Sequence, residues 1–520
     1  MTAEADDNQR ARGAAADAPW RGALLCFGVA IAAATLAILD FAPRLAYWPG
    51  LNYAMAREVS EYGRAKVTIA QVEDPWAPIT APMHKVLAWR LLLPLVWHYL
   101  HLPPQLLLAV PHLGCLVTLW LVAWLTQRRM ANWPLAILVT LLFAALPWFF
   151  VSTGWLGYFD SWLVLGLLAA AFLPSRMALA LACLLTPWID ERFVIALPAT
   201  MMVRAAALRR VENHEGRAVC RDLAVVFAAS LPFAAIRAVV WLRGDPDSTI
   251  YVHAHWLSVF QISWQRYLAG FWSGYRAGWV VVGAALWLLP KRVGRRWGAA
   301  FALVVLGTAV GGLFIAADMS RSLMMICPVL LLGAWLGYAS RPAIFHWLLP
   351  LVVAANYLLP AAHEIWFMTV GISHMGTEFQ RLRGPVPEIL AAATRIEDAL
   401  ALINQGKFDE ARGKLDEALE LDPFSTTAYV NRAKLKLAGQ DFGGAMADAE
   451  AALRINPMTP AALYIRGCLR AARGERAPAV DDIRNSLYLA GPTWNLRPQA
   501  EQVLKQLTEP ARPEDRRADP

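Results

Sequence analysis

Residues 22–42, GALLCFGVAIAAATLAILDFA, form an apolar run that contains one charged residue, Asp40. At a rise of about 1.5 Å per residue, a helix of this length spans the roughly 30 Å hydrocarbon core of a bilayer. Arg10, Arg12 and Arg21 precede the run, and no small-residue cleavage site separates it from a polar mature domain. The stretch therefore predicts a membrane anchor rather than a cleaved signal peptide.

Further apolar runs follow this first one along the chain. They are 105–126, 133–151, 161–173, 177–203, 223–242, 277–289, 297–317, 322–339 and 343–361. Together they predict an all-α fold, a polytopic bundle of about ten membrane-spanning helices, although several runs are short for a span.

Composition divides the 520 residues into two unlike parts. Residues 1–387 hold 22 of the 23 tryptophans and carry 30 Lys+Arg against 20 Asp+Glu, whereas residues 388–520 carry 18 against 20. This contrast excludes a single soluble globule and a disordered chain. The six cysteines form no CxxC pair, which argues against a zinc site and against a disulfide scaffold.

The basic excess of the first part lies in short clusters between apolar runs: Arg128-Arg129, Ser175-Arg176, Arg204–Arg221, Lys291–Arg296 and Arg341. This is the distribution of the positive-inside rule, so the net charge of +8 does not indicate a nucleic-acid partner. All clusters face the cytoplasm if the N-terminus is inside and residues 85–101 form an amphipathic or re-entrant helix. If residues 85–101 span the membrane, every later segment reverses. The first scheme predicts a bacterial inner-membrane protein with an extracytoplasmic C-terminal domain.

The C-terminal part contains an internal repeat of 34 residues. Glu410-Ala411, Ala418 and Asp422-Pro423 recur as Ala445, Ala452 and Asn456-Pro457, and a looser third copy has Ala479 and Gly491-Pro492. Small alanines let two antiparallel helices pack closely, and the proline ends the second helix of each pair. Residues 388–492 therefore resemble about three tetratricopeptide repeats, which implies a surface that binds a protein partner or acceptor.

These patterns predict five regions. We expect a disordered N-terminus (1–20), a transmembrane domain (21–362) whose first outer loop is 43–104, a linker (363–387), the repeats (388–492), and a C-terminal helix with a disordered tail (493–520).

Ionisable side chains at the ends of apolar helices are costly unless they pair or have a function. In the first orientation scheme the following candidates share the outer face: Asp40, Arg90, the triplet Asp190-Glu191-Arg192, Asp318 and Arg321. Carboxylates can take a proton or bind a divalent cation, and arginines can clamp a phosphate. Asp160 and the pair His253 and His255 are weaker candidates on the same face, and His363, Glu364 and His374 are expected to be linker residues. An interfacial ion pair explains Asp318 and Arg321 equally well.

The first part also resembles the polytopic C-type (GT-C) glycosyltransferases, which use sugars linked to polyprenyl phosphate. The resemblance rests on Asp40 after the first apolar helix, on the segment 82–94 (PMHKVLAWRLLLP) and on the segment 186–198 (TPWIDERFVIALP). It implies that Asp40 is the catalytic base and that a polyprenyl-phosphate sugar is the donor. The adjacent acidic pair of the metal-dependent members is absent at Asp40, and Glu73-Asp74 is the nearest substitute, so the need for a divalent cation is open.

Three functions are therefore compatible with the sequence. The first is inverting transfer of a sugar to an acceptor hydroxyl at the outer face, in which Arg90, Arg192 or Arg321 binds the donor phosphate and the repeats hold an acceptor. The second is a membrane-anchored tetratricopeptide scaffold without enzymatic activity. The third is a component of polysaccharide polymerisation or assembly. In architecture, a membrane core followed by repeats, this chain also resembles the repeat-bearing O-mannosyltransferases. In those enzymes the repeats lie on the same side of the membrane as the active site.

Overall fold

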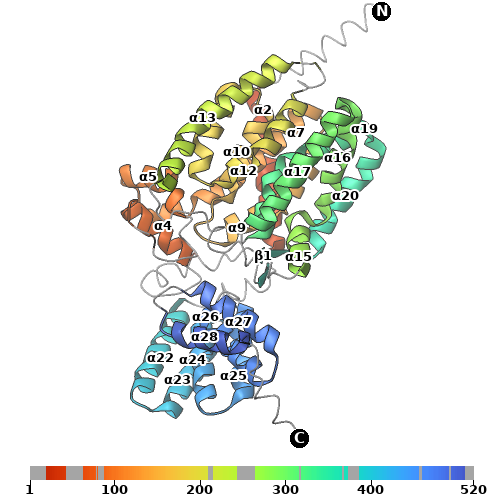
Figure 1. The fold of residues 1–520 in the computed structure, drawn as a ribbon. Helices are drawn as coiled ribbons and strands as arrows, with labels where there is room; N and C mark the ends of the chain where they lie inside the picture. The colour runs from red at the N-terminus through yellow and green to blue at the C-terminus, as the bar shows by residue number, and fades with distance from the viewer. Residues whose placement is uncertain are drawn as a thin grey trace, which may run out of the picture.

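The computed structural model describes residues 19–41, 48, 63–77, 79, 87–208, 213, 215–242, 264–315, 318–365, 368–372, 386–455, 459–490 and 494–509. They form two bodies that lie end to end (Figure 1). The larger body is a bundle of helices that ends with residue 358, and the smaller is a stack of antiparallel helices from residue 386 onward. An antiparallel hairpin, β1 (Ala362–Ile365) and β2 (Met368–Gly371), lies where the two bodies meet.

The apolar runs of the sequence become the helices of the bundle. In chain order these are α2 (Pro19–Phe41), α4 (Gly63–Glu73), α5 (Leu92–Tyr99), α6 (Pro104–Leu107), α7 (Val110–Met130), α8 (Trp133–Ala144), α9 (Pro147–Gly154), α10 (Asp160–Phe172), α11 (Arg176–Leu185), η4 (Thr186–Trp188), α12 (Arg192–Ala207), α13 (Gly216–Leu242), α15 (Trp264–Tyr275), η6 (Arg276–Gly278), α16 (Trp279–Val293), α17 (Arg295–Ile315), α18 (Met319–Ser322), η7 (Leu323–Ile326), α19 (Cys327–Ser340) and α20 (Pro342–Leu358).

Five described helical segments are long and apolar enough to cross a membrane: Trp20–Phe41, Pro104–Met130, Gly216–Val239, Arg295–Phe314 and Met319–Ser340. The bent pair α8 and α9 would make a sixth. The expectation of about ten spans is therefore not met by length and composition, because α10, α11 and α20 have only 13, 10 and 17 residues. Helix α5 has eight residues, about 12 Å, so residues 85–101 contain no described helix of spanning length.

The run 177–203, expected to be one segment, is two helices. Pro187 lacks an amide hydrogen, and the chain leaves α11 through η4 before α12 begins at Arg192. Asp190 accepts a hydrogen bond from the amide of Arg192 (3.1 Å), which satisfies a donor at the start of α12. The break places Asp190 and Glu191 in a short connection inside the bundle.

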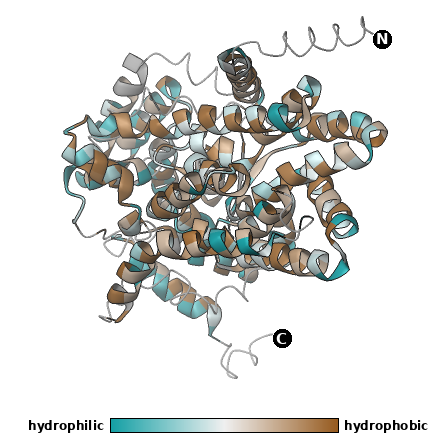
Figure 2. Cartoon of the chain, turned by 90° about the horizontal axis from the view of Figure 1, so that it is seen from above, coloured by the Kyte–Doolittle hydropathy of each residue, from teal (hydrophilic) through white to brown (hydrophobic). Residues whose placement is uncertain are grey.

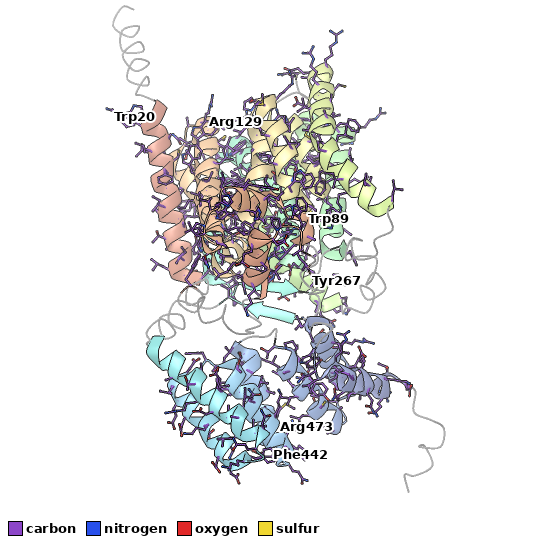
Figure 3. The ribbon with its side chains drawn as sticks, turned by 90° about the vertical axis from the view of Figure 1, so that its left-hand side faces the viewer. Trp20, Trp89, Arg129, Tyr267, Phe442 and Arg473 are labelled. Atoms are coloured by element: carbon purple, nitrogen blue, oxygen red, sulfur yellow. The ribbon has the colours of Figure 1, made fainter. Side chains whose placement is uncertain are left out.

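The two ends of the bundle differ in charge. Arg128 and Arg129 lie in the last turn of α7, and Lys291 and Arg292 lie in the last turn of α16. Figure 3 shows Trp20 and Arg129 at the end of the bundle that lies away from the repeats. Which side of a membrane this end faces stays a prediction.

The helices of the bundle consist largely of apolar residues, as the brown ribbons of Figure 2 show, and these residues lie outside as well as inside the bundle. Inside, α8, α9, α10, α12 and α19 share one continuous hydrophobic core, in which Trp148 and Phe143 are fully buried. Outside, Phe227, Leu303 and Trp347 are each more than 70% exposed. A monomeric soluble protein rarely exposes so much apolar surface, so the outside is suited to lipid.

The smaller body consists of α22 (Val386–Asn404), α23 (Phe408–Leu421), α24 (Thr426–Ala438), α25 (Phe442–Ile455), α26 (Pro460–Ala472), α27 (Arg476–Leu489) and α28 (Arg497–Thr508). Consecutive helices pack as antiparallel pairs, and the repeat alanines Ala411, Ala418, Ala445, Ala452 and Ala479 are completely buried. The turn inside each pair repeats every 34 residues as well. It places Gly406, Gln440 and Gly474 at φ of 76°, 62° and 79°, a left-handed conformation that favours glycine.

The repeats contact the bundle through the segment that joins α9 to α10. Val151 and Trp155 belong to the same hydrophobic cluster as buried residues of α24, α25 and α26, and Tyr158 and Ile372 pack against this cluster. Asp160 follows two residues after Tyr158, and the guanidinium of Arg321 lies over the Tyr158 ring, so the contact lies beside buried charged groups of the bundle.

Candidate functional site

A continuous chain of buried ion pairs crosses the part of the bundle that adjoins the repeats. Acidic and basic groups alternate along it in the order Glu191, Arg90, Asp190, Arg192, Asp160, Arg321, Asp318, His363. Each of its three arginines lies within 4 Å of two carboxylates. This ion-pair chain brings together six of the seven candidate residues of the sequence.

Arg192 occupies the centre of the ion-pair chain. Its Nη2 donates to Asp160 Oδ1 and to Asp190 Oδ2, both at 2.6 Å, and its Nε donates to Asp190 Oδ1 at 2.9 Å. The side chains of Asp160 and Asp190 are each only 1% exposed. Removing two charges from water is expensive, and these short charge-assisted bonds compensate for it.

Arg90 extends the ion-pair chain toward the first loop. It follows a single turn at residues 87–89 and donates from Nε and Nη2 to the two oxygens of Glu191, each at 3.1 Å. Its Nη1 lies 3.2 Å from Asp190 Oδ2. Glu191 is 26% exposed, so this end of the ion-pair chain is the more accessible one.

Arg321 extends it toward the hairpin. Its Nη1 lies 3.3 Å from Asp160 Oδ2 and its Nη2 lies 2.7 Å from Asp318 Oδ2. His363 of β1 reaches Asp318 Oδ1 through Nε2 (3.3 Å) and Ser320 Oγ through Nδ1 (3.0 Å). Asp318 and Arg321 therefore form the ion pair that was one interpretation of the sequence. That pair is also part of the larger group of candidate site residues, which was the other.

The arginines determine the charge state of the carboxylates. Burial alone would raise the pKa of Asp190, but the charges of Arg192 and Arg90 hold that pKa well below its ordinary value. For Asp318, burial acts in the same direction, and Arg321 and His363 more than offset it, so its pKa is also lowered. Both groups are carboxylates at neutral pH and accept hydrogen bonds rather than donate them.

One arginine beside the ion-pair chain differs from the others. Arg64, in the first turn of α4, is 8% exposed, and its Nε donates to the carbonyl oxygen of Gly157 at 2.8 Å. Its guanidinium carbon lies 3.8 Å from the centre of the Tyr158 ring, and that of Arg321 lies 4.7 Å from the same centre. Among the described residues, no carboxylate lies within ion-pair distance of Arg64. Arg64 is not among the candidates predicted from the sequence, because nothing around it in the sequence marks it as buried.

Asp40 does not join the ion-pair chain by any described contact. At the end of α2, its carboxylate interacts electrostatically with Arg276 and Tyr357. Arg276 donates to the carbonyl oxygens of Asn356, Leu359 and Ala145 and lies near the ring of Phe41. The described contacts therefore link the predicted base to Arg276 and Tyr357, and the predicted phosphate-binding residues to one another.

The remaining polar candidates of the sequence lie in different parts of the chain. His363 and Glu364 were expected to be linker residues, but they are buried in β1, at 5% and 3% exposure. The hairpin pairs strands across the expected linker and brings them against α18. Asp160, the weaker candidate, lies in the middle of the ion-pair chain. His253, His255 and His374 lie outside the described residues.

Within the described part of the chain, no group of three or more His, Cys, Asp or Glu side chains is arranged to hold a metal ion. The carboxylates of the ion-pair chain face guanidinium groups instead. Glu73 and Asp74 are exposed, and Asp74 accepts a hydrogen bond from the amide of Trp76. The arrangement is therefore suited to binding charged groups and to fixing local geometry, and it does not favour a cation site.

The repeats contain a second periodic ion pair. Asp448 of α25 accepts from Arg432 and contacts Lys436, and 34 residues later Asp482 accepts from Arg466 and Arg470. Both carboxylates are nearly buried, at 5% and 4% exposure, and each ties the two helices of one repeat together. The equivalent positions in the first repeat are Asp398 and Lys414, so that repeat lacks the pair.

Comparison with known proteins supports the repeat assignment. No model of a known protein family matches the chain. The tetratricopeptide repeat and J domain-containing co-chaperone DNJ1 of Cryptococcus neoformans is 34% identical over 98 residues, and the FAM10 family protein At4g22670 of Arabidopsis thaliana is 39% identical over 85 residues. The matches cover 19% and 16% of this chain, and the chain spans only 19% of the length of each relative.

Two solved structures of tetratricopeptide domains also match part of the chain. The first tetratricopeptide domain of Spaghetti (RPAP3), bound to an HSP90 peptide, and the Arabidopsis OM64 tetratricopeptide domain are 25% and 26% identical to it. Each covers 23% of this chain, with 94% and 98% of its own length and a TM-score of 0.21. The sequence relatives, together with the 34-residue period of buried alanines and turns, show that the chain contains tetratricopeptide-like repeats. These relatives give no support to the glycosyltransferase resemblance, which stays a prediction.

Proposed function

We propose that this chain is a membrane-anchored tetratricopeptide protein whose repeats bind a protein partner. The observation that carries the proposal is the 34-residue register of the second body, which appears in the sequence, in the buried alanines and in the turn residues. Stacked repeats of this kind present an extended surface to partners. The relative DNJ1 is named as a co-chaperone, which is consistent with such a role.

The membrane part of the proposal rests on the bundle. Five to six helices have the length and apolar character of spans, and their outward side chains are apolar. The bundle would hold the repeats at a fixed distance from the bilayer, because Val151 and Trp155 join the two bodies through one hydrophobic cluster.

The test compares buried and exposed carboxylates that contact arginines of the repeats. Asp448→Asn combined with Asp482→Asn removes the buried partners of both ion pairs, and we expect loss of partner association while the protein stays in the membrane fraction. Asp416→Asn is the matched control, since Asp416 bonds Arg432 at 2.7 Å but is 50% exposed. Partner recovery that is equal in all three proteins, despite loss of helicity in the double variant, would show that the repeats are not the binding element.

A second candidate function is transfer of a sugar from a polyprenyl-phosphate donor to an acceptor hydroxyl. It is favoured by the ion-pair chain, which gathers buried arginines and carboxylates, and by Asp40, which lies in the last turn of α2. In this hypothesis the Asp40 carboxylate takes the proton of the hydroxyl, and the hydroxyl oxygen attacks the anomeric carbon. The bond from that carbon to the phosphate oxygen breaks with inversion, and polyprenyl phosphate leaves.

The discriminating assay supplies a polyprenyl-phosphate sugar to the reconstituted full chain. Asp40→Asn should abolish transfer without loss of folded protein, whereas Glu215→Gln, which changes an exposed carboxylate before α13, should leave transfer unchanged. Full transfer by Asp40→Asn would remove Asp40 from the mechanism. No transfer by the unmodified chain, combined with intact partner binding, would leave the scaffold as the function.

A further inference from the structure

Arg64 is a buried cation whose charge the described residues do not neutralise. Arg90, Arg192 and Arg321 each face two carboxylates, but the contacts of Arg64 are a carbonyl oxygen and the face of Tyr158. Burial, together with the nearby charges of Arg90 and Arg321, lowers the pKa of Arg64 to about 10. The group is still a cation at neutral pH, so its desolvation is not compensated.

Among the described residues, three of the buried guanidinium nitrogen atoms of Arg64 and the ion-pair chain stand out because they have no hydrogen-bond acceptor. They are Nη2 of Arg64, Nη1 of Arg192 and Nε of Arg321, whose residues are 8%, 5% and 3% exposed. Buried donors are almost always satisfied in folded proteins, because an unsatisfied one costs about 1–3 kcal/mol. Several such donors in one region therefore indicate an acceptor that the described residues do not supply.

The donors are close enough to share one ligand. The guanidinium carbons of Arg64 and Arg321 lie 3.8 and 4.7 Å from the centre of the same Tyr158 ring, so they are at most roughly 8.5 Å apart. Arg321 and Arg192 in turn contact the two oxygens of one carboxylate, Asp160. A tetrahedral oxyanion with a central atom about 4 Å from each of two guanidinium carbons joins groups up to about 8 Å apart, which is close to this upper limit.

We propose that Arg64, with the free donors of Arg192 and Arg321, binds the phosphate group of a ligand beside Tyr158. A phosphate offers several acceptor oxygens in different directions, as required by donors from three separate arginines, and arginine is well suited to bind it. The site differs from the sequence expectation, because Arg90 and the bidentate edge of Arg192 are already occupied by carboxylates. It deepens the second candidate function, on which it rests only for the identity of the phosphate's carrier.

The experiment measures binding of inorganic phosphate to the reconstituted full chain by isothermal calorimetry and by the shift of its thermal unfolding. We expect saturable binding by the unmodified chain and at least a tenfold weaker affinity in Arg64→Gln. Arg64→Lys keeps a cation but offers only one point of contact, so its phosphate affinity should lie between those of the unmodified chain and Arg64→Gln. It replaces the glutamine variant in the experiment if that variant does not fold.

Arg276→Gln is the matched control. Arg276 is also buried, at 1% exposure, but its donors are used by backbone carbonyl oxygens. This variant should unfold at a lower temperature and keep the same phosphate affinity. An equal loss of affinity in both variants would assign the effect to general destabilisation and overturn the site, as would the absence of phosphate binding by the unmodified chain.

A competition arm identifies the carrier of the phosphate. Displacement of inorganic phosphate by polyprenyl phosphate in nanodiscs assigns the site to a lipid headgroup, and binding that the lipid does not affect assigns it to a soluble phosphate. Both results retain the site. Asp40→Asn separates this site from the transfer reaction, because that variant should lose transfer and keep phosphate affinity.

Discussion

Replacing Arg192 by glutamine should be among the most damaging single changes in the bundle. The substitution removes hydrogen bonds of 2.6, 2.6 and 2.9 Å to two carboxylates that are each 1% exposed. Breaking a buried ion pair on one side costs about 3–5 kcal/mol, because an uncompensated charge stays buried. Asp190 keeps Arg90 at 3.2 Å and Asp160 keeps Arg321 at 3.3 Å, so we expect a loss near the lower end, about 3 kcal/mol.

Unfolding of the reconstituted chain, followed by circular dichroism during denaturant titration, gives this free-energy difference. Arg176→Gln is the control, because Arg176 is 43% exposed and its partner Asp222 keeps a second bond, of 2.5 Å, to Arg204. Such an exposed pair contributes about 1 kcal/mol or less. If Arg192→Gln cost no more than Arg176→Gln, the central ion pairs would not have the energetic role assigned to them.

A double variant tests whether the unpaired charge of Asp190 causes part of this loss of stability. In Arg192→Gln the Asp190 carboxylate has lost its strongest partner, so also neutralising it with Asp190→Asn should recover part of the lost stability. The folded-state pKa of Asp190 lies below its unfolded value, so its contribution is present above the ordinary aspartate pKa of about 3.9 and is lost as the pH falls. Removing Arg192 moves the folded-state pKa of Asp190 back toward its unfolded value, so the part of the stability that is lost on acidification should become smaller in Arg192→Gln. A double variant that is less stable than the single one would refute the alternating-charge description.

Three further outcomes follow from the structure. In the repeats, Asp482→Asn should lower the stability of α26 and α27, measured by hydrogen exchange, by about 1–3 kcal/mol. The exposed control Asp416→Asn should change the stability by less than about 1 kcal/mol. Equal effects of the two variants would contradict the role of burial. Trp155→Ala should weaken the contact between the two bodies and speed proteolysis of residues 373–385, and an unchanged cleavage rate would show that the contact contributes nothing to docking. Reporter fusions after Arg383 should be active outside the cytoplasm, and cytoplasmic activity would reverse the predicted orientation.

The second body was largely predictable, because its structure is local. Each 34-residue repeat is one helical pair, so the positions of Ala411 and Ala445 and the turn at Gly406 follow from spacing alone. The ion pairs of Asp448 and Asp482 were also visible as a 34-residue spacing, since Arg432 and Arg466 recur with them, but charged residues on helices usually form solvated faces, and only the structure shows these two carboxylates to be buried.

The helices of the bundle could be predicted from the sequence, but the number of helices long enough to cross a membrane could not. Hydropathy identifies apolar runs but does not distinguish a span from a shorter helix, and α10 and α11 are such shorter helices. The run 177–203 contained its own break signal at Pro187, which lies beside the charged triplet.

The sequence by itself determined which residues carry charge at the ends of apolar helices, because an ionisable group in such a position is costly wherever the helix packs. Only the tertiary structure decided how those charges pair. Asp160, Asp190 and Asp318 come from three separate parts of the chain, and Arg64 and His363 come from two more, so their distances depend on helix packing that no local pattern encodes. The physical reason is that electrostatic energy depends on separation and burial, and both are properties of the folded chain.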